Sequence, residues 1–410
     1  MLMPAPLTLA SRRLRAAVIA LLLVAAAAAL VLSGAALAQA RPAGVPVGFV
    51  GVDIDGPLFN AARPLDLNRQ MGTMVSNGVE SVRVAFNWAA AQPYASWSKV
   101  PSEQRSEFVN GPQGRPISFV ATDEIVGDAA KQGITVLPTL LYAPGWDAKP
   151  NRHGYFATPK RDAPYAEFAG AMVRRYGPRG SFWSQNRQIH KVPIRLWQIW
   201  NEPNIATYWP QPFARSYVSL LRLAHTAIKQ ADRGAKVVLG ALTNLAWHSI
   251  GSIYRIGGAR RLFDAVSVNG FSGNPANVIL YLRFMRHAMD RYGDATKPMI
   301  ASELSWPSAR GQTPQHFEFN TTQNGQARDI AQLLPMLGVW RTRLVLSGFY
   351  YYTWMGLEFK GAPAFSFAGL VRENKKGQVN TKPALNAFRR GSLALESCRS
   401  KGSTATRCRH

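Results

Sequence analysis

The chain has 410 residues, of which 47% are hydrophobic, so it can bury one large core or two ordinary ones. It carries 48 lysines and arginines against 23 aspartates and glutamates, a formal net charge of +25. The basic residues are scattered singly or in pairs and form no recognisable nucleic-acid module, so no nucleic-acid partner is expected. Such a charge predicts instead a loose association with polyanions such as an anionic cell envelope.

The first forty residues have the layout of a secretory signal peptide. The features are, in chain order, Arg12, Arg13 and Arg15, an uninterrupted apolar run over residues 16–32, and cleavage triplets at 36–38 and 38–40. The alternative is an uncleaved membrane anchor, because the run approaches the length that spans a bilayer. The Ala-x-Ala triplets favour cleavage, which lowers the net charge from +25 by three arginines to +22. We therefore expect a secreted or extracytoplasmic protein, with N-terminal anchoring as the alternative.

After this leader, short apolar runs alternate with helical patterns. We predict strands near residues 47–53, 81–86, 134–141, 195–200, 236–241, 264–269, 298–302 and 346–353. Apolar residues recur at three- and four-residue spacing in helix-length segments, most clearly over 212–231, 276–293 and 326–340.

The alternation of these elements predicts the fold class. Nearly continuous apolar strands are typical of a parallel sheet with both faces covered. Eight of them with intervening helices predict an α/β fold, a single (β/α)8 TIM barrel over residues 41–395. The alternative, a doubly wound open sheet, lacks a Gly-x-Gly-x-x-Gly after the first strand.

Two loops are long for a compact domain. They cover residues 87–119 after the second strand and 142–164 after the third, and both are rich in Pro, Gly and aromatic residues. Both leave the carboxyl ends of strands, the face on which barrel enzymes build their sites.

The fourth strand ends in a carboxylate. Residues 196–204 read LWQIWNEPN, so an apolar run stops at Asn201 and Glu202. Pro203 disfavours helical geometry at Glu202 and predicts an extended conformation there. Glu202 would then be displayed at the carboxyl end of the strand. The alternative is an Asn-Glu-Pro turn without function.

A second glutamate strengthens the functional interpretation. The seventh strand, in KPMIASELSWPS over residues 297–308, ends at Glu303. The carboxyl ends of barrel strands share one mouth, so Glu202 and Glu303 are expected to meet there. Two carboxylates without a metal suit cleavage of a glycosidic bond, with one as acid and the other as nucleophile. A hydrophobic environment and a nearby carboxylate would both keep the acid protonated.

Other residues near strand ends are candidates for the same site. Arg83 ends the second strand and could keep a partner carboxylate ionised, although a core or surface arginine is an equal interpretation. Four tryptophans follow strand ends, where their rings could stack on sugars, although each alone is more often a packing residue. They are Trp88, Trp146, Trp306 and Trp354.

These segments resemble the clan A retaining glycoside hydrolases. The likeness is closest to the family of β-xylosidases and α-L-iduronidases, and more distant to the cellulase and mannanase family. It is strongest at RLWQIWNEPNIATYW, good at PMIASELSW and GFYYYTWMG, and weaker at SVRVAFNWAAAQP. The resemblance implies a barrel in which Glu202 is the acid/base and Glu303 the nucleophile. It also implies that Asn201 binds the sugar 2-hydroxyl.

The same resemblance extends to two further positions and fails at a third. It implies that Arg83 steadies Glu303 and that Trp354 forms part of a sugar platform. The clan's sixth strand often ends in a His-x-Tyr-like pair near the nucleophile, whereas Asn269 and Phe271 stand here. Asn269 is therefore a candidate site residue, and the nucleophile's hydrogen-bonding partner is unassigned.

The sequence thus predicts a secreted retaining glycoside hydrolase that cleaves a β-linked oligo- or polysaccharide by double displacement. The alternative is a non-catalytic glycan-binding or envelope-associated barrel. No cofactor or metal is expected, because the histidines are dispersed without a His-Glu-x-x-His spacing. A Gly-x-Ser-x-Gly elbow and a phosphate-binding loop are also absent from the sequence.

The last fifteen residues, 396–410, form a basic tail with both cysteines, Cys398 and Cys408. No histidine or carboxylate is spaced to complete a metal site with them. In an exported protein a small disulfide loop is the better interpretation.

Overall fold

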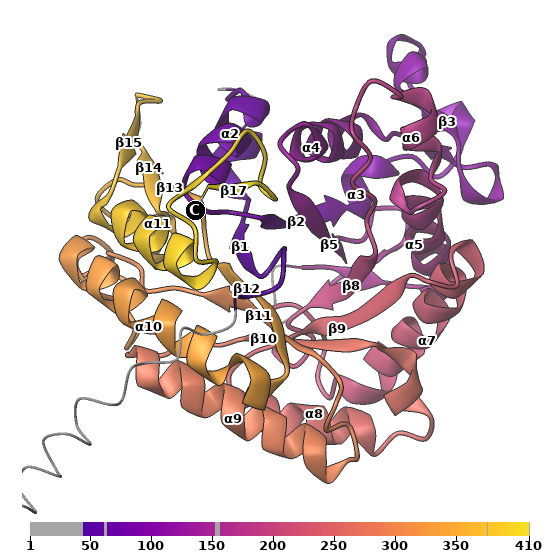
Figure 1. Ribbon diagram of the computed structural model, residues 1–410. Coiled ribbons are helices and arrows are strands. Elements are labelled where there is room, and N and C mark those ends of the chain that lie inside the picture. The colour runs from indigo at the N-terminus through magenta and orange to yellow at the C-terminus, as the bar shows by residue number, and fades with distance from the viewer. Residues whose placement is uncertain (1–43, 61–63, 152–155, 375, 410) are drawn as a thin grey trace, which may run out of the picture. The chain divides into compact units, whose positions relative to one another are not determined.

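The computed structural model describes residues 44–60, 64–151, 156–374 and 376–409, so the predicted leader lies outside the described residues. Eight parallel strands close into a barrel in the order of the sequence (Figure 1). They are β1 (Val50–Asp53), β2 (Ser81–Asn87), β5 (Thr135–Leu141), β8 (Leu196–Asn201), β9 (Lys236–Leu242), β10 (Ala265–Asn269), β11 (Met299–Leu304) and β12 (Leu346–Tyr351). Because β1 pairs with both β12 and β2, the sheet is closed and the open-sheet alternative is wrong. The predicted (β/α)8 TIM barrel is confirmed.

Helices form the outer layer around these strands (Figure 1). They are α2 (Leu67–Ser76), α3 (Trp88–Ala91), α4 (Val120–Lys131), α5 (Asp162–Tyr176), α6 (Ser181–Gln185), α7 (Ala214–Ala231), α8 (Ala246–Tyr254), α9 (Pro275–Arg291), α10 (Gln323–Leu344) and α11 (Pro383–Leu395). Side-chain caps fix where several of them begin, because they satisfy otherwise unpaired backbone donors. Asp66 accepts from Arg69 N at the start of α2, and Asn274 accepts from Asn277 N at the start of α9.

The core has two main parts, and a third, small apolar cluster lies in the connections after β11 and β12. A large cluster of buried apolar residues lies between strands and helices. A smaller cluster contains strand residues and no helix residue, as expected for the interior of a small barrel. Its buried members are Leu137, Val238, Ala265, Ile300 and Tyr350. Polar side chains at the barrel mouth therefore lie above packed apolar side chains of the barrel interior.

Four connections at the carboxyl ends of the strands are long, those after β2, β5, β11 and β12, and three of them carry further elements. After β2 come α3, η2 (Trp97–Lys99), η3 (Ser102–Glu107), η4 (Pro112–Gly114) and the pair β3 (Val109–Asn110) with β4 (Pro116–Ile117). After β5 comes the pair β6 (Ala148–Lys149) and β7 (Thr158–Pro159). The connection after β12 carries η6 (Ala364–Phe367) and a small sheet of β13 (Met355–Leu357), β14 (Val371–Glu373) and β15 (Val379–Thr381). The first two long loops match the prediction, whereas the long connections after β11 and β12 were not predicted.

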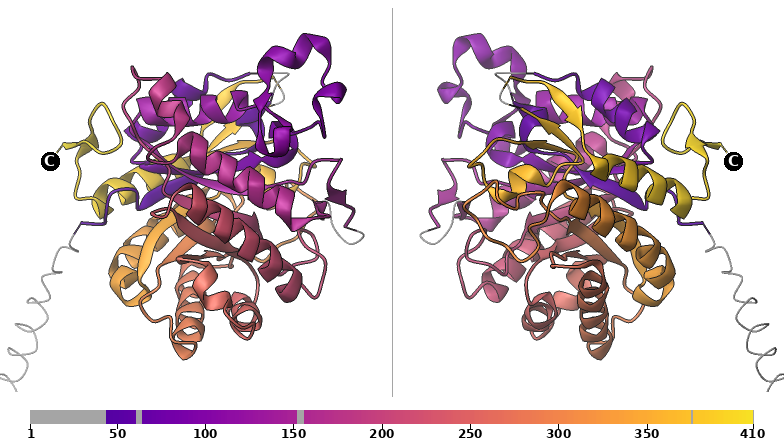
Figure 2. Two further views of the ribbon diagram at one scale, coloured as in Figure 1. Left: turned by 90° about the vertical axis from the view of Figure 1, so that its right-hand side faces the viewer. Right: turned by 90° about the vertical axis from the view of Figure 1, so that its left-hand side faces the viewer.

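The C-terminal tail packs against the amino end of the barrel. It forms the pair β16 (Ser400–Lys401) and β17 (Cys408–Arg409), closed by the predicted Cys398–Cys408 disulfide with a Cα–Cα distance of 5.4 Å. In both side views of Figure 2 this tail and the loop after β2 lie at opposite ends of the barrel. The tail therefore lies away from the mouth.

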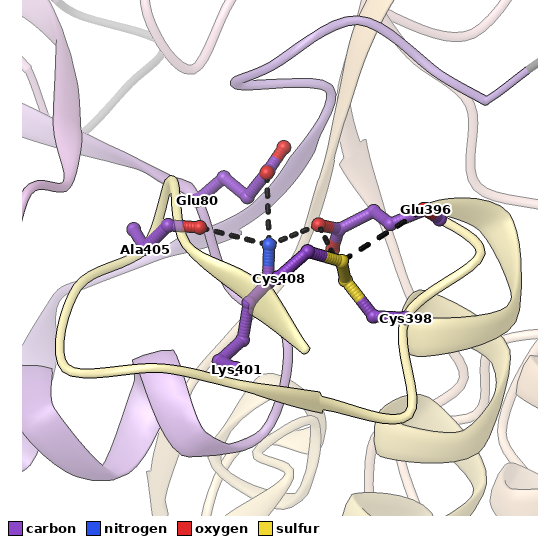
Figure 3. Close-up of a disulfide and its surroundings, with 6 residues drawn as sticks. All are labelled: Glu80, Glu396, Cys398, Lys401, Ala405 and Cys408. Carbon is purple, nitrogen blue, oxygen red and sulfur yellow. Dashed lines mark hydrogen bonds and ion pairs between the residues drawn. A yellow bond between two sulfur atoms is a disulfide. The ribbon is translucent and has the colours of Figure 1, made fainter. Parts of the chain in front are cut away.

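A buried lysine joins the tail to the barrel (Figure 3). The Nζ of Lys401 donates to Glu80 Oε1 at 2.9 Å and to Ala405 O at 2.8 Å, and it also pairs with Glu396. Its side chain is 1% exposed. Within the described part of the chain, no helix is long and apolar enough to cross a membrane.

Candidate active site

A cavity of about 310 Å³ opens at the carboxyl ends of the barrel strands. Polar and aromatic side chains from seven strands and the loops that follow them line it. The charged lining residues among those described are Asp53, Asp55, Arg83, Glu202 and Glu303. Both predicted glutamates are thus in one cavity, each with 8% of its surface exposed.

Glu202 follows the last residue of β8. Its N–H donates to Ala241 O on β9 at 2.9 Å, and its carbonyl accepts from Ile205 N at 3.2 Å in a turn. The predicted extended conformation is wrong, because the φ of Glu202 is +42° and that of Trp200 is +67°. Left-handed backbone is costly for residues other than glycine, and such strain clusters at functional sites. The turn directs the chain away from the sheet immediately after the carboxylate.

The Glu202 carboxyl group is suited to hold a proton. Burial, followed by the charge of Glu303, raises its pKa to about 8. The Nδ2 of Asn269 donates to Glu202 Oε1 at 2.7 Å and opposes this rise, because the bond favours the ionised form. At neutral pH the group is therefore mostly protonated and can act as an acid.

Glu303, on β11, faces a cation instead. Arg83 Nη1 donates to Glu303 Oε1 at 2.8 Å. Burial raises the pKa of Glu303, while the charge and the hydrogen bond of Arg83 lower it. Arg83 therefore contacts Glu303, and its role in steadying that carboxylate stays a prediction. Two carboxyl groups in one cavity thus have different partners, which is how acid and nucleophile roles are separated.

Arg83 connects four strands at the floor of the cavity. Its Nη1 also donates to Asp53 Oδ1 at 2.6 Å. Its Nη2 donates to Asn201 Oδ1 at 2.8 Å, and its Nε donates to Gln198 Oε1 at 3.0 Å. The guanidinium therefore holds Asn201 beside Glu202, and Gln198 is a supporting residue that the sequence did not single out for a role.

Asn269 lies between the two glutamates. It ends β10 and pairs in register with Glu303 on β11. Its Oδ1 accepts from Ser302 Oγ at 2.8 Å, which fixes the amide so that Nδ2 faces Glu202. The departure from the clan's pattern at this position therefore leaves a donor that binds the proposed acid.

The aromatic lining comes from residues that the sequence did not suggest. On one side Phe156 stacks on Tyr208 with ring centroids 4.4 Å apart, and Tyr142 lies 5.3 Å from Phe156. On the other side Phe271 meets Phe365 at 5.2 Å and Tyr352 at 6.4 Å. Tyr142 and Tyr352 directly follow strands, and that position was the available signal.

The four predicted tryptophans do not line this cavity. Trp88, Trp306 and Trp354 are fully buried, and Trp146 is half-buried. Each indole N–H donates to an internal acceptor, as expected for packed tryptophans. The acceptors are Gln92 Oε1 for Trp88, Gln92 O for Trp146, Ser272 O for Trp306 and Gln70 Oε1 for Trp354. The structure gives these residues a packing role.

Two aspartates in the cavity were also missed. Asp53 and Asp55 occupy alternate positions at the end of β1, so both face the barrel interior. Tyr352 Oη donates to Asp55 Oδ2 at 2.7 Å, and Thr353 Oγ1 donates to Asp55 Oδ1 at 2.8 Å. The signal was the sequence VDID at a strand end.

One cluster among the described residues has the spacing of metal ligands. It comprises Glu396, Cys398 and Cys408. The two sulfurs are joined in the disulfide and are therefore not available as thiolate ligands.

Comparisons with known proteins agree with the fold. No protein-family model and no curated protein sequence matches the chain. A monomeric β-xylosidase from Caulobacter crescentus is 18% identical with a TM-score of 0.56. The match covers 86% of this chain and 69% of the β-xylosidase. A family 39 glycoside hydrolase from Bacteroides cellulosilyticus is 16% identical with a TM-score of 0.59. The match covers 86% of this chain and 64% of the Bacteroides enzyme. The GH53 catalytic domain of Ignisphaera aggregans is 19% identical with a TM-score of 0.54. The match covers 85% of this chain and 98% of the GH53 domain. At these identities the likeness shows a shared barrel fold, and the chain spans less than two thirds of the Bacteroides enzyme.

Proposed function

We propose that this protein is a retaining glycoside hydrolase of clan A, closest to the β-xylosidase and α-L-iduronidase family. The observation that carries the proposal is the pair Glu202 and Glu303 at the ends of β8 and β11. One carboxyl group has a pKa of about 8 and the other accepts a hydrogen bond from Arg83. The solved structures with the same fold include a β-xylosidase and a family 39 glycoside hydrolase, which supports it further.

The first step breaks the glycosidic bond. A carboxylate oxygen of Glu303 attacks the anomeric carbon while Glu202 gives its proton to the leaving oxygen. The bond to the leaving group breaks, and a glycosyl ester forms on Glu303. Arg83 keeps Glu303 oriented and ionised through the 2.8 Å hydrogen bond.

The second step releases the sugar. Glu202, now ionised, removes a proton from a water that attacks the anomeric carbon, and Glu303 leaves as a carboxylate. Two inversions give net retention of configuration. Asn201 is the proposed partner of the sugar 2-hydroxyl, because it lines the cavity beside Glu202 and Arg83 fixes its Oδ1.

The proposed substrate is a β-linked oligo- or polysaccharide. Aromatic rings on both sides of the cavity offer flat apolar faces to pyranose rings. The basic chain, with its signal-peptide-like leader, supports secretion and loose association with an anionic cell envelope.

Hydrolysis of glycosides with a Glu303 variant as control tests the activity. The purified protein is assayed against nitrophenyl glycosides and plant or microbial polysaccharides, together with Glu303→Gln and Glu124→Gln. Glu124 is exposed on α4, so its variant is the matched control. We expect Glu303→Gln to lower kcat by roughly 10⁴-fold or more, because the nucleophile is lost.

Two results would contradict the proposal. Undiminished hydrolysis by Glu303→Gln would show that another group is the nucleophile. Glycan binding without hydrolysis by the wild-type protein would favour the alternative, a glycan-binding barrel, for which Asn269 and Phe271 in place of the clan's usual pair are the supporting observation.

A further inference from the structure

The charge of the cavity is opposite to that of the chain. The chain has 23 acidic and 48 basic residues. The cavity lining, as far as the structure describes it, contains four carboxyl groups and one guanidinium. Glu202 and Glu303 account for two of the carboxyl groups, which leaves Asp53 and Asp55 without a role in bond cleavage.

Four of the five N–H donors of the one guanidinium are already engaged. Arg83 donates to two carboxylates, Asp53 and Glu303, and to the side-chain oxygens of Gln198 and Asn201. These four bonds involve all three of its nitrogens, so it has little capacity to bind an anionic group of a substrate. Among the described lining residues, a sugar carboxylate would meet carboxyl groups and find no second cation to pair with.

Asp55 is the most accessible of the four carboxyl groups. It is half-buried, whereas the other three are buried. Tyr352 and Thr353 each donate one hydrogen bond to it, which fixes its orientation and leaves further lone pairs on both oxygens. Asp55 is therefore a pre-oriented acceptor at the edge of the cavity.

Asp53 adds a second, independent observation. It is 4% exposed and lines the cavity, yet its Oδ2 has no hydrogen-bond partner among the described residues. Buried polar atoms without partners are rare and call for an explanation. Burial raises the pKa of both Asp53 and Asp55, so a cation entering the cavity would stabilise their ionised forms.

We propose that the cavity selects a sugar carrying a protonated amine, and that Asp55 is the residue that binds this amine. The inference rests on the proposed function and names its substrate class. An ammonium group donates up to three hydrogen bonds, and charge-assisted bonds to a carboxylate are about twice as strong as neutral ones. The parent sugar offers a neutral hydroxyl at the same place, and a uronic acid would be repelled.

The attraction is local to the cavity. Charges further apart than about 8 Å are largely screened at physiological ionic strength. The positive charge of the surface therefore does not prevent an amino sugar from binding beside Asp55.

Binding of simple sugars to the wild-type protein tests the inference without requiring turnover. The ligands are the methyl glycosides of the hexosamines 3-amino-3-deoxy-, 4-amino-4-deoxy- and 6-amino-6-deoxyglucose, whose amines lie away from the 2-position assigned to Asn201, each compared with the parent hexose and its uronic acid by calorimetry at pH 6. We expect at least one hexosamine to bind about 10- to 100-fold more tightly than its parent hexose. We expect its uronic acid to bind more weakly than the hexose.

Asp55→Asn should abolish this preference, while Asp290→Asn, at an exposed aspartate on α9, should keep it. If no hexosamine binds more tightly than its parent hexose, or if Asp55→Asn keeps the preference, the inference is overturned. Hydrolysis of neutral glycosides without an amine preference would overturn it and leave the proposed activity intact. Asp55-dependent amine binding without hydrolysis of any glycoside would support the amine site and contradict the proposed activity.

Discussion

The proton on Glu202 depends on its contact with Asn269. Burial raises the pKa of Glu202 to about 8, and the hydrogen bond from Asn269 limits that rise. The acid must be protonated for the first step, so activity towards glycosides with poor leaving groups should fall as pH rises through about 8. The lower limit is set by ionisation of Glu303, whose pKa is raised by burial.

Asn269→Ala should move the alkaline limit upward. The variant removes a bond that favours ionised Glu202, so the pKa of Glu202 rises and the acid stays protonated to higher pH. We expect a shift of about half to one pH unit in the alkaline limb of kcat/KM, measured with an alkyl glycoside that the wild-type protein hydrolyses.

Asn324→Ala, at an exposed asparagine on α10, is the control for this variant, because it removes an amide that lies outside the cavity lining. This control should keep the alkaline limb of the kcat/KM profile near its wild-type pH. If the alkaline limb of kcat/KM in Asn269→Ala stays in place or moves to lower pH, the bond from Asn269 to Glu202 does not set the protonation of the acid.

At the site, the sequence indicated the polar groups better than the aromatic ones. Glu202 and Glu303 were predictable because each stands at the end of an apolar strand, and barrel topology brings strand ends together. Arg83 is the third residue of β2, so it reaches the site from within the strand and not from its end. The left-handed backbone of Glu202 was not predictable, because the rule for residues before proline says only that the right-handed helical region is disfavoured. Phe156 and Phe365 lie in loops, where no periodicity shows which side chains turn inward.

Among the elements, the strands were predictable and the connections were not. All eight barrel strands lie at or within one to three residues of their predicted bounds, because buried parallel strands are continuous apolar runs. The sheet of β13, β14 and β15 was missed because its strands are three residues each, too short to show a pattern. The tail is attached through a buried lysine, which looks like any other basic residue in the sequence, and through a backbone hydrogen bond from Ala405 to Gln132.

Lys401→Met should destabilise the protein. It leaves Glu80 and Glu396 beside each other in a buried position without their shared cation. Removing one partner of a buried ion pair typically costs about 3–5 kcal/mol. Urea unfolding measures the loss, with Arg399→Met, at an exposed site on the same tail, as the matched control. Equal stability of the two variants would show that the lysine does not anchor the tail.

The whole molecule combines an acidic cavity with a basic surface. The net charge of +25, or +22 without the leader, predicts binding to anionic cell-wall preparations that weakens steeply as salt rises. Hydrolysis of a small neutral glycoside should change little over the same range, because the catalytic carboxyl groups are buried and screened less by salt. Wall binding that is indifferent to salt would contradict the proposed envelope association.

The central claim is that Glu303 forms a covalent bond to the sugar. The direct measurement is mass spectrometry of the protein after treatment with a 2-deoxy-2-fluoro glycoside of whichever sugar it hydrolyses. We expect one added sugar, on the peptide that contains Glu303, and none in Glu303→Gln. A label on a different residue, or continued hydrolysis with inverted configuration and no label, would contradict it.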